Sequence, residues 1–410
     1  MERIFTRINT IHAFHSGPLG PYLKNFAENS NQQGYARESI QVQLRAINRF
    51  GRWLKRRRIT LRKFQLTDAQ VYLRQNGDVR QGDARTLQRF LDLLAAQSAI
   101  LTPQVRKKTK VDVFADKFAE HLKYERGLAP RTVKYYRGFV ALFLGWRFGK
   151  NSDHDLDLAR IHGGDLVAFV QEEAARRSAG SARMITASLR SFLRYSVLRG
   201  ALGRDISGAI PKVRCYSLAG IPRFLAPGQV KRVLASCDRR TAMGRRDYAI
   251  LLLLSRLGLR ACEVGSLELE DIDWTAGTLT IRGKGAKVCK LPLPHDVGKA
   301  IAAYLRRDRP AVPARRVFLR LLAPHTGFAG PQGVCQMVRE TLARAGVQSQ
   351  SKGAHQFRHS LATRMLANRA TLADIGQVLR HAMPKTTFIY TKVDIRGLRA
   401  LVRHWPGGAQ

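Results

Sequence analysis

Residues 248–294 read YAILLLLSRLGLRACEVGSLELEDIDWTAGTLTIRGKGAKVCKLPLP, a stretch whose pattern changes from helical to alternating. The apolar run ends at Gly258, where glycine suits a helix C-cap, and a second helix is predicted to begin at Arg260. Farther on, two alternating segments flank Lys284 and Lys287, a pattern typical of a β-hairpin with lysines in its turn. We therefore expect helices joined to a small antiparallel sheet in the C-terminal part of the chain.

The composition predicts a nucleic acid partner. The chain has 71 Lys and Arg against 30 Asp and Glu, a formal net charge of +41 that would repel itself without a polyanion. Apolar residues make up 45% of the 410 residues, so the chain can bury real cores, and at roughly 150 residues per domain we expect about three domains. A disordered basic tail is excluded.

The cysteines favour neither a metal site nor a disulfide framework. None of the five forms a C-x-x-C pair, which indicates a reducing cytoplasm and no zinc. The first residues lack the apolar run of a signal peptide, and no stretch reaches the roughly 18 apolar residues of a membrane span. We expect no membrane association. The cysteines are Cys215, Cys237, Cys262, Cys289 and Cys335.

The N-terminal half contains a repeat. Residues 35–58 align with residues 128–150, which places Phe50 over Phe143 and Trp53 over Trp146. The match continues, with small shifts, to the segments that begin at Thr67 and Gly164 and at Ala84 and Ala182. Apolar residues recur at helical spacing in both copies, so each copy is predicted to be a small helical bundle.

Arginines dominate the predicted surface of these bundles. A solvated charged face is the simple interpretation, but few acidic residues are interleaved to neutralise the arginines, which favours DNA contacts. A protein-binding role for the first bundle is the competing hypothesis. The candidate DNA-binding residues are Arg45, Arg49, Arg52, Arg56, Arg57, Arg58, Arg131 and Arg137.

Polar connectors divide the chain. A basic segment without apolar periodicity ends near Thr109, and a segment with three prolines and three glycines begins at Asp205. The expected fold is mainly α with a small antiparallel sheet: two helical bundles, then an α+β C-terminal domain. The expected boundaries are 1–108 for the first bundle, 111–204 for the second, 205–223 for an extended basic linker and 224–410 for the C-terminal domain.

The last part of the chain carries a second group of polar signals. His355 and Arg358 lie three residues apart and are predicted to share a helix face. Thr371 opens a capping-box pattern, and His381 follows near the end of that helix. Tyr390 is predicted to begin a last short helix.

The chain resembles the tyrosine recombinase (phage integrase) family, because six of its residues occur in the order and approximate spacing of that family's motif residues. The blocks GLRACEVGSLELEDID, GKGAKVCKLPLP, HQFRHSLATRML and LRHAMPKTTFIYTKV look like that family's motifs. The resemblance covers about residues 111–402, and it likens the second bundle to a core-binding domain and the C-terminal domain to the catalytic domain. The six residues are Arg260, Lys284, His355, Arg358, His381 and Tyr390.

The resemblance implies DNA strand cleavage without ATP or any other cofactor. Tyr390 would attack phosphorus and form a 3′-phosphotyrosine, releasing a 5′-hydroxyl. Arg260 and Arg358 would bind the non-bridging oxygens, a task for which the fixed charge and planar fork of arginine are suited. Since tyrosine has an ordinary pKa near 10, it needs a base, and His355 is the implied one.

Three further roles follow from the same resemblance. Lys284 would protonate the leaving 5′-oxygen, although an ordinary turn lysine is the competing interpretation and Lys287 lies close by. His381 would hydrogen-bond the phosphate, and Glu263 would orient the site. Arg380 stands where the family usually has glycine, and the sequence assigns it no effect.

The biological role stays open at this level. A mobile-element integrase or transposase is favoured over a chromosome-dimer resolvase, because of the additional bundle at residues 1–108. A type IB topoisomerase and a DNA-binding protein with an inactive catalytic domain are two further hypotheses. The expected partners are double-stranded DNA, three further copies of the chain in a tetramer, and, as an open option, partner recombinases. An apolar face would dock on a neighbouring copy or on its own domain; it comprises Val393, Leu398, Leu401 and Val402.

Overall fold

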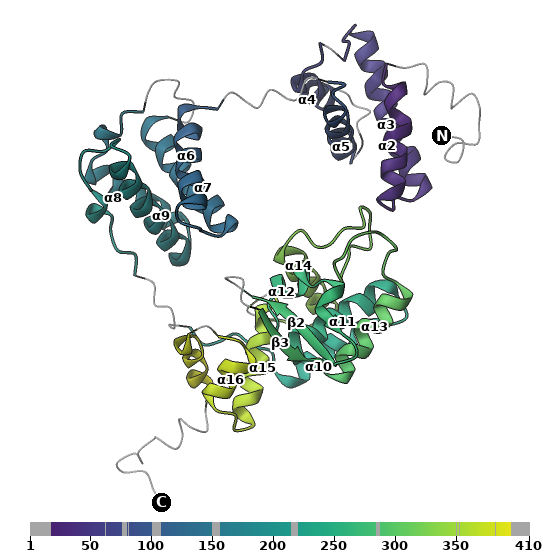
Figure 1. Cartoon of the computed structure of the whole chain (residues 1–410), viewed down its shortest axis with the longest axis vertical. Coiled ribbons are helices and arrows are strands. Elements are labelled where there is room, and N and C mark those ends of the chain that lie inside the picture. The colour runs from purple at the N-terminus through teal and green to yellow at the C-terminus, as the bar shows by residue number, and fades with distance from the viewer. Residues whose placement is uncertain are drawn as a thin grey trace, which may run out of the picture. The chain divides into compact units, whose positions relative to one another are not determined.

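The described chain is mainly helical, with one antiparallel sheet, as the sequence predicted (Figure 1). Residues 101–219 form one compact unit, and residues 1–100 and 220–410 are grouped in the other. Among the described helices, none combines the length and apolarity that a membrane crossing requires. The computed structural model describes residues 18–61, 63–75, 80, 82–100, 108–149, 156–214, 220–283, 288–349, 351, 353–381 and 383–394.

The first bundle packs four helices around an aromatic group. Phe50 and Trp53 of one helix stack with ring centroids 6.1 Å apart, and both contact Tyr72 of the next helix, at 5.0 and 5.6 Å. All three side chains are buried, so they form an aromatic contact between the two helices. The helices are α2 (Gly20–Gln32), α3 (Arg37–Arg56), α4 (Leu66–Gln75) and α5 (Asp83–Ala96).

The second bundle repeats this arrangement. Phe143 and Trp146 stack at 6.4 Å, and both contact Phe169, at 5.2 and 5.5 Å. These residues occupy the positions that the sequence alignment paired with Phe50, Trp53 and Tyr72, which confirms the repeat. The elements are α6 (Lys110–Tyr124), α7 (Pro130–Phe148), η1 (Leu158–Arg160), α8 (Gly163–Arg176), α9 (Ala179–Leu198) and η2 (Ser207–Ala209).

The two copies differ in how deeply their tryptophans are buried. Trp53 is 6% exposed, whereas Trp146 is 40% exposed and donates its indole N–H to Glu172 at 2.9 Å.

The first part of the segment after residue 205, which was predicted to be an extended connector, folds onto the second bundle. Ile210 is buried there, and its carbonyl accepts a hydrogen bond from Arg190 at 2.8 Å.

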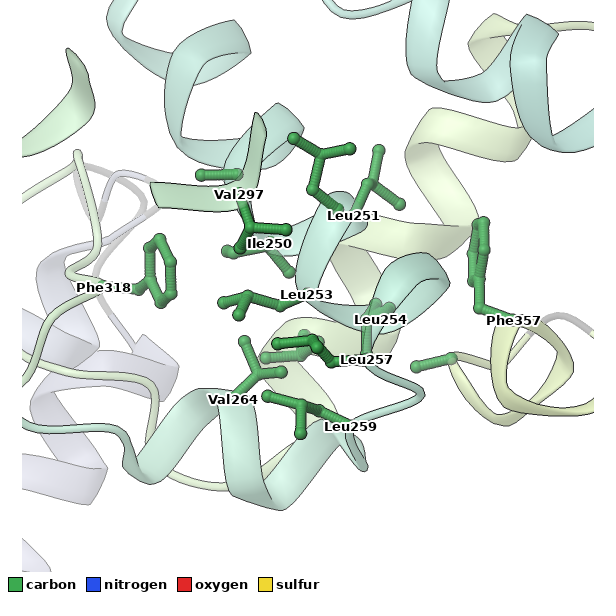
Figure 2. Packing of buried hydrophobic residues seen from close by; sticks show 14 of the residues in the cluster. Ile250, Leu251, Leu253, Leu254, Leu257, Leu259, Val264, Val297, Phe318 and Phe357 are labelled. Carbon is green, nitrogen blue, oxygen red and sulfur yellow. The ribbon is translucent and has the colours of Figure 1, made fainter. Parts of the chain in front are cut away.

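The C-terminal region surrounds one buried helix. Residues 249–254 of helix α11 are apolar on every side: Ile250, Leu251, Leu253 and Leu254 are all fully buried (Figure 2). This burial explains the long apolar run, since a helix surrounded by protein needs no polar face. The helices are α10 (Pro227–Ala235), α11 (Ala242–Arg256), α12 (Ala261–Ser266), α13 (His295–Arg307), α14 (Pro331–Arg344), α15 (His355–Ala367) and α16 (Leu372–Val378), with the 3-10 turns η3 (Leu269–Asp271), η4 (Pro384–Thr386) and η5 (Phe388–Val393).

The sheet confirms the predicted hairpin and adds a strand. Strand β2 (Thr278–Arg282) pairs antiparallel with β3 (Val288–Pro292), with Thr280 opposite Lys290. A two-residue strand, β1 (Ile272–Asp273), pairs with the other edge of β2, which the sequence did not predict. The hairpin turn at 284–287 lies outside the described residues.

Candidate active site

Gly258 links the end of α11 to the site. Its φ of +57° lies in the left-handed region, and a Cβ there would meet Leu379 at 2.8 Å and Leu361 at 3.0 Å. Glycine is therefore required for both backbone and space. The carbonyl of this glycine accepts a hydrogen bond from Arg358 Nη1 at 2.7 Å. The helix end predicted from the sequence is thus also the support for a site arginine.

Arg358 of α15 is buried, with 1% of its surface exposed. Its guanidinium donates to the carbonyls of Gly258 and Leu379, and no carboxylate forms an ion pair with it within the described part of the chain. Burial, followed by the charges of Arg260 and Arg380, lowers the pKa of Arg358 to about 10. A buried cation without a counterion is costly, so this site favours an entering anion.

Glu263 joins two further arginines beside it. One carboxylate oxygen accepts from Arg260 Nη1 at 2.8 Å, and the other accepts from the Arg260 backbone N–H at 2.9 Å and from Arg380 Nη2 at 3.0 Å. The Glu263 side chain is 2% exposed. The predicted orienting role of Glu263 agrees with this geometry. Arg380, whose effect the sequence left open, is the second cation bound to Glu263.

Tyr390 lies in η5, and only 1% of its surface is exposed. Its hydroxyl is 3.0 Å from Nδ1 of His359, a residue that sequence reasoning did not select. Burial raises the pKa of Tyr390 to about 12, with Arg358 acting in the opposite direction. The spacing of His355 and His359 by one helical turn was the signal that could have identified His359.

The other two histidines surround this pair. His381 stacks on Tyr390 with ring centroids 6.4 Å apart, and its Nδ1 is 2.8 Å from the Thr387 hydroxyl. His355 contacts His359 edge-on at 4.6 Å and is the most exposed of the three. The structure thus brings five of the six predicted residues to one region, while Lys284 lies outside the described residues.

The candidate DNA-binding arginines fall into two groups. The expectation of sparse acidic neighbours is wrong for Arg49, which pairs with Asp83 at 2.7 Å. It is also wrong for Arg137, which pairs with Asp112 and Asp116, both at 2.9 Å.

The remaining candidates have weaker partners or none. Arg57 lies over the Trp53 ring at 4.8 Å, and Arg131 donates to the Tyr135 hydroxyl at 3.3 Å. Four others are exposed and make no ion pair within the described part of the chain: Arg45, Arg52, Arg56 and Arg58.

The described residues offer no metal site. No group of three or more His, Cys, Asp or Glu side chains there could hold an ion. Cys237, Cys262, Cys289 and Cys335 are free, and Cys215 lies outside the described residues.

Comparison with known proteins identifies the family. Residues 223–396 match the "Phage integrase family" and residues 115–200 match the "Phage integrase, N-terminal SAM-like domain". A Sinorhizobium fredii protein named "Putative integrase/recombinase" is 42% identical over 397 residues, 96% of each chain. The chain belongs to the phage integrase family of tyrosine recombinases. It is therefore an enzyme of DNA strand cleavage and rejoining.

Two other similar proteins fit this family assignment. Tyrosine recombinase XerD of Listeria monocytogenes is 31% identical over 283 residues, 67% of this chain and 92% of that protein. The crystal structure of XerH recombinase bound to a palindromic difH substrate, a post-cleavage complex, has a TM-score of 0.54 at 19% identity, covering 80% of this chain and 90% of that one. The latter likeness establishes the fold. Neither family model reaches residues 18–100, which contain the first bundle.

Proposed function

We propose that this recombinase cleaves DNA through a covalent 3′-phosphotyrosine at Tyr390. The observation that carries the proposal is a buried tyrosine hydroxyl within the electrostatic influence of a buried guanidinium, Arg358, that makes no ion pair in the described structure. A scissile phosphate would supply the missing negative charge and bring phosphorus to the nucleophile. Arg260 and Arg358 would stabilise the charge that develops on the phosphate oxygens.

Other side chains complete the proposed chemistry. By the family resemblance His355 would take the tyrosine proton, His381 would hydrogen-bond the phosphate, and Lys284 would protonate the leaving 5′-oxygen. The energy of the phosphodiester is kept in the phosphotyrosine bond, so rejoining is the reverse attack by a 5′-hydroxyl and needs no ATP.

A suicide DNA substrate tests this proposal. A nick close to the cleavage position lets a short 5′-hydroxyl fragment diffuse away, which traps the protein on DNA. The wild-type protein should form a covalent adduct, while Tyr390→Phe should bind the same duplex and form none. An adduct that persists in the phenylalanine variant would remove Tyr390 from the mechanism.

The biological role that fits best is integration, excision or transposition of a mobile element. Its support is the similarity, over nearly the whole chain, to a protein named as an integrase or recombinase. The host compartment would be the DNA-containing cytoplasm. Mapping covalent junctions on the ends of the host element would test this role against a chromosomal one, since a resolvase would join copies of a chromosomal site instead.

The proposed active assembly is a tetramer on two duplexes. A lambda integrase tetramer bound to a Holliday junction shares the fold, with a TM-score of 0.52 at 13% identity over 76% of this chain and 88% of that one. The C-terminal apolar face would join neighbours, although Leu398, Leu401 and Val402 lie outside the described residues. Deletion from Asp394 onward should spare single-site binding and abolish pairing of sites; loss of folded protein would instead favour packing within one chain.

The first bundle is proposed to bind DNA outside the core site. Arg45, Arg52 and Arg56 are exposed on α3 at spacings of seven and four residues, which place them on one helical face. The exposed Arg58 follows the end of this helix. Such a stripe suits the regularly spaced phosphates of a duplex. A second DNA-binding bundle would lengthen the protected DNA.

Salt dependence distinguishes DNA binding from protein binding. Since each phosphate contact adds about 0.9 to the slope of log K against log salt, removing residues 1–100 with roughly four contacts should flatten it by about 3.6. The triple variant R45Q/R52Q/R56Q should remove about 2.7 of this slope, because three contacts are lost. An unchanged footprint and slope in both proteins would instead indicate that the bundle binds another protein.

A further inference from the structure

We propose that His359 accepts the proton of Tyr390 during DNA cleavage, in place of His355. This inference rests on the proposed function, since it assigns a base to the same nucleophile. It adds a catalytic residue that the sequence motifs did not select.

The contacts of the three histidines carry the assignment. His359 Nδ1 lies 3.0 Å from the Tyr390 hydroxyl, within the reach that a general base needs. His381 has its Nδ1 against the Thr387 hydroxyl at 2.8 Å. For His355 the described contact is edge-on with the His359 ring, at 4.6 Å. Only the His359 nitrogen touches the reacting oxygen within the described structure.

Packing holds the histidine and the tyrosine in this geometry. Helix α15 carries His359, and the buried Leu361 and Ala362 of that helix pack in one cluster with Tyr390. The hydroxyl approaches Nδ1 with ring centroids 5.6 Å apart and planes inclined by 64°. The pair is therefore set by a hydrophobic cluster before DNA arrives, as preorganised catalysis requires.

The electrostatic environment keeps this pair ready but inactive in the free protein. Burial, then His355 and Arg358, lower the pKa of His359 to about 4, so at neutral pH the ring is neutral and can accept the hydroxyl proton. Tyr390 has a pKa raised to about 12 by burial and keeps its proton. An entering phosphate would offset the arginine charge and stabilise an imidazolium, which favours proton transfer only when substrate is bound.

The proposed step balances without any additional reactant. The Tyr390 O–H proton moves to His359 Nδ1 while the tyrosine oxygen forms a bond to phosphorus. The bond from phosphorus to the 5′-oxygen breaks, and that oxygen takes a proton from the ammonium group of Lys284. In the rejoining step both protons return.

Asparagine substitutions separate the two candidate bases, because asparagine keeps a short polar side chain but cannot take the proton. His359→Asn should slow adduct formation on the suicide substrate by about 100-fold or more, with unchanged DNA binding. The matched control, His355→Asn, should lose less. Near-normal cleavage by His359→Asn, or a larger loss in His355→Asn, would overturn the assignment.

A substrate with sulfur at the bridging 5′ position distinguishes a base from an acid. A thiolate leaving group needs no proton, so this substrate should restore cleavage to Lys284→Ala but leave His359→Asn slow. Restoration of His359→Asn would mean that His359 acts on the leaving group instead, and would overturn the proposal.

If His359→Asn does not fold, His359→Ala with added imidazole replaces it. Imidazole should restore adduct formation in a concentration-dependent manner, while failure to restore cleavage by folded, DNA-bound protein would contradict the proposal. Failure of the proposed function is a separate result: the wild-type protein then forms no adduct at Tyr390 at all.

Discussion

Replacing Arg380 separates two opposing effects of one residue. Its φ of +56° is a left-handed conformation, which costs a residue with a Cβ about 1–2 kcal/mol. Against this cost, its guanidinium pairs with Glu263 at 3.0 Å, with the two side chains 12% and 2% exposed. Glycine removes both the strain and the ion pair, alanine removes only the ion pair, and lysine keeps a charge with the same backbone.

The magnitudes give an order of stability. Losing an ion pair that is mostly buried should cost about 2 kcal/mol, between the values for exposed and for fully buried pairs. Arg380→Ala should therefore lower the free energy of unfolding by about 2 kcal/mol, whereas in Arg380→Gly the relief of strain returns about 1 kcal/mol. Arg380→Lys should lie closest to the wild type.

Urea denaturation of the three variants, with DNA absent, measures their free energies of unfolding and so this order. In a thermal melt, the difference of about 1 kcal/mol between the glycine and alanine variants corresponds to about 2–4 °C in the melting temperature of a domain of this size. Equal stability of the two, or a more stable alanine variant, would refute the strain argument. Equal stability of alanine and lysine variants would show that the pair with Glu263 contributes nothing.

Other perturbations test the remaining geometry. Gly258→Ala should lower the free energy of unfolding by about 2–3 kcal/mol, because the methyl group meets Leu379 at a left-handed position, and urea denaturation measures the loss. Arg358→Lys should reduce suicide-substrate cleavage by about 100-fold or more with similar DNA binding, since lysine cannot span both carbonyls and the phosphate. Because burial lowers the pKa of His359 and His381 to about 4 from the unfolded value near 6.5, stability should fall as the pH decreases through that window. Melting curves recorded at each pH should show this fall in stability, and the fall should be smaller in His359→Asn and in His381→Asn.

Local patterns in the sequence determined much of the fold. The end of α11 just before Gly258, the capping box at Thr371 and the hairpin were all readable, because each depends on residues a few positions apart. The repeat was readable for a related reason, since two copies with the same apolar spacing pack the same aromatic positions. The motif order selected five residues that the structure brings to one region.

Only tertiary packing decided which side chains meet. His359 and Tyr390 are 31 positions apart, and Glu263 and Arg380 are 117 apart, so no periodicity within one element relates them. The same limit explains why the few acidic residues interleaved in the sequence did not predict the ion pairs of Arg49 and Arg137: Asp83 and Asp112 lie on other helices. The composition of a segment determines its secondary structure and buried face, whereas an ion pair or a proton acceptor depends on which helices a common core brings together.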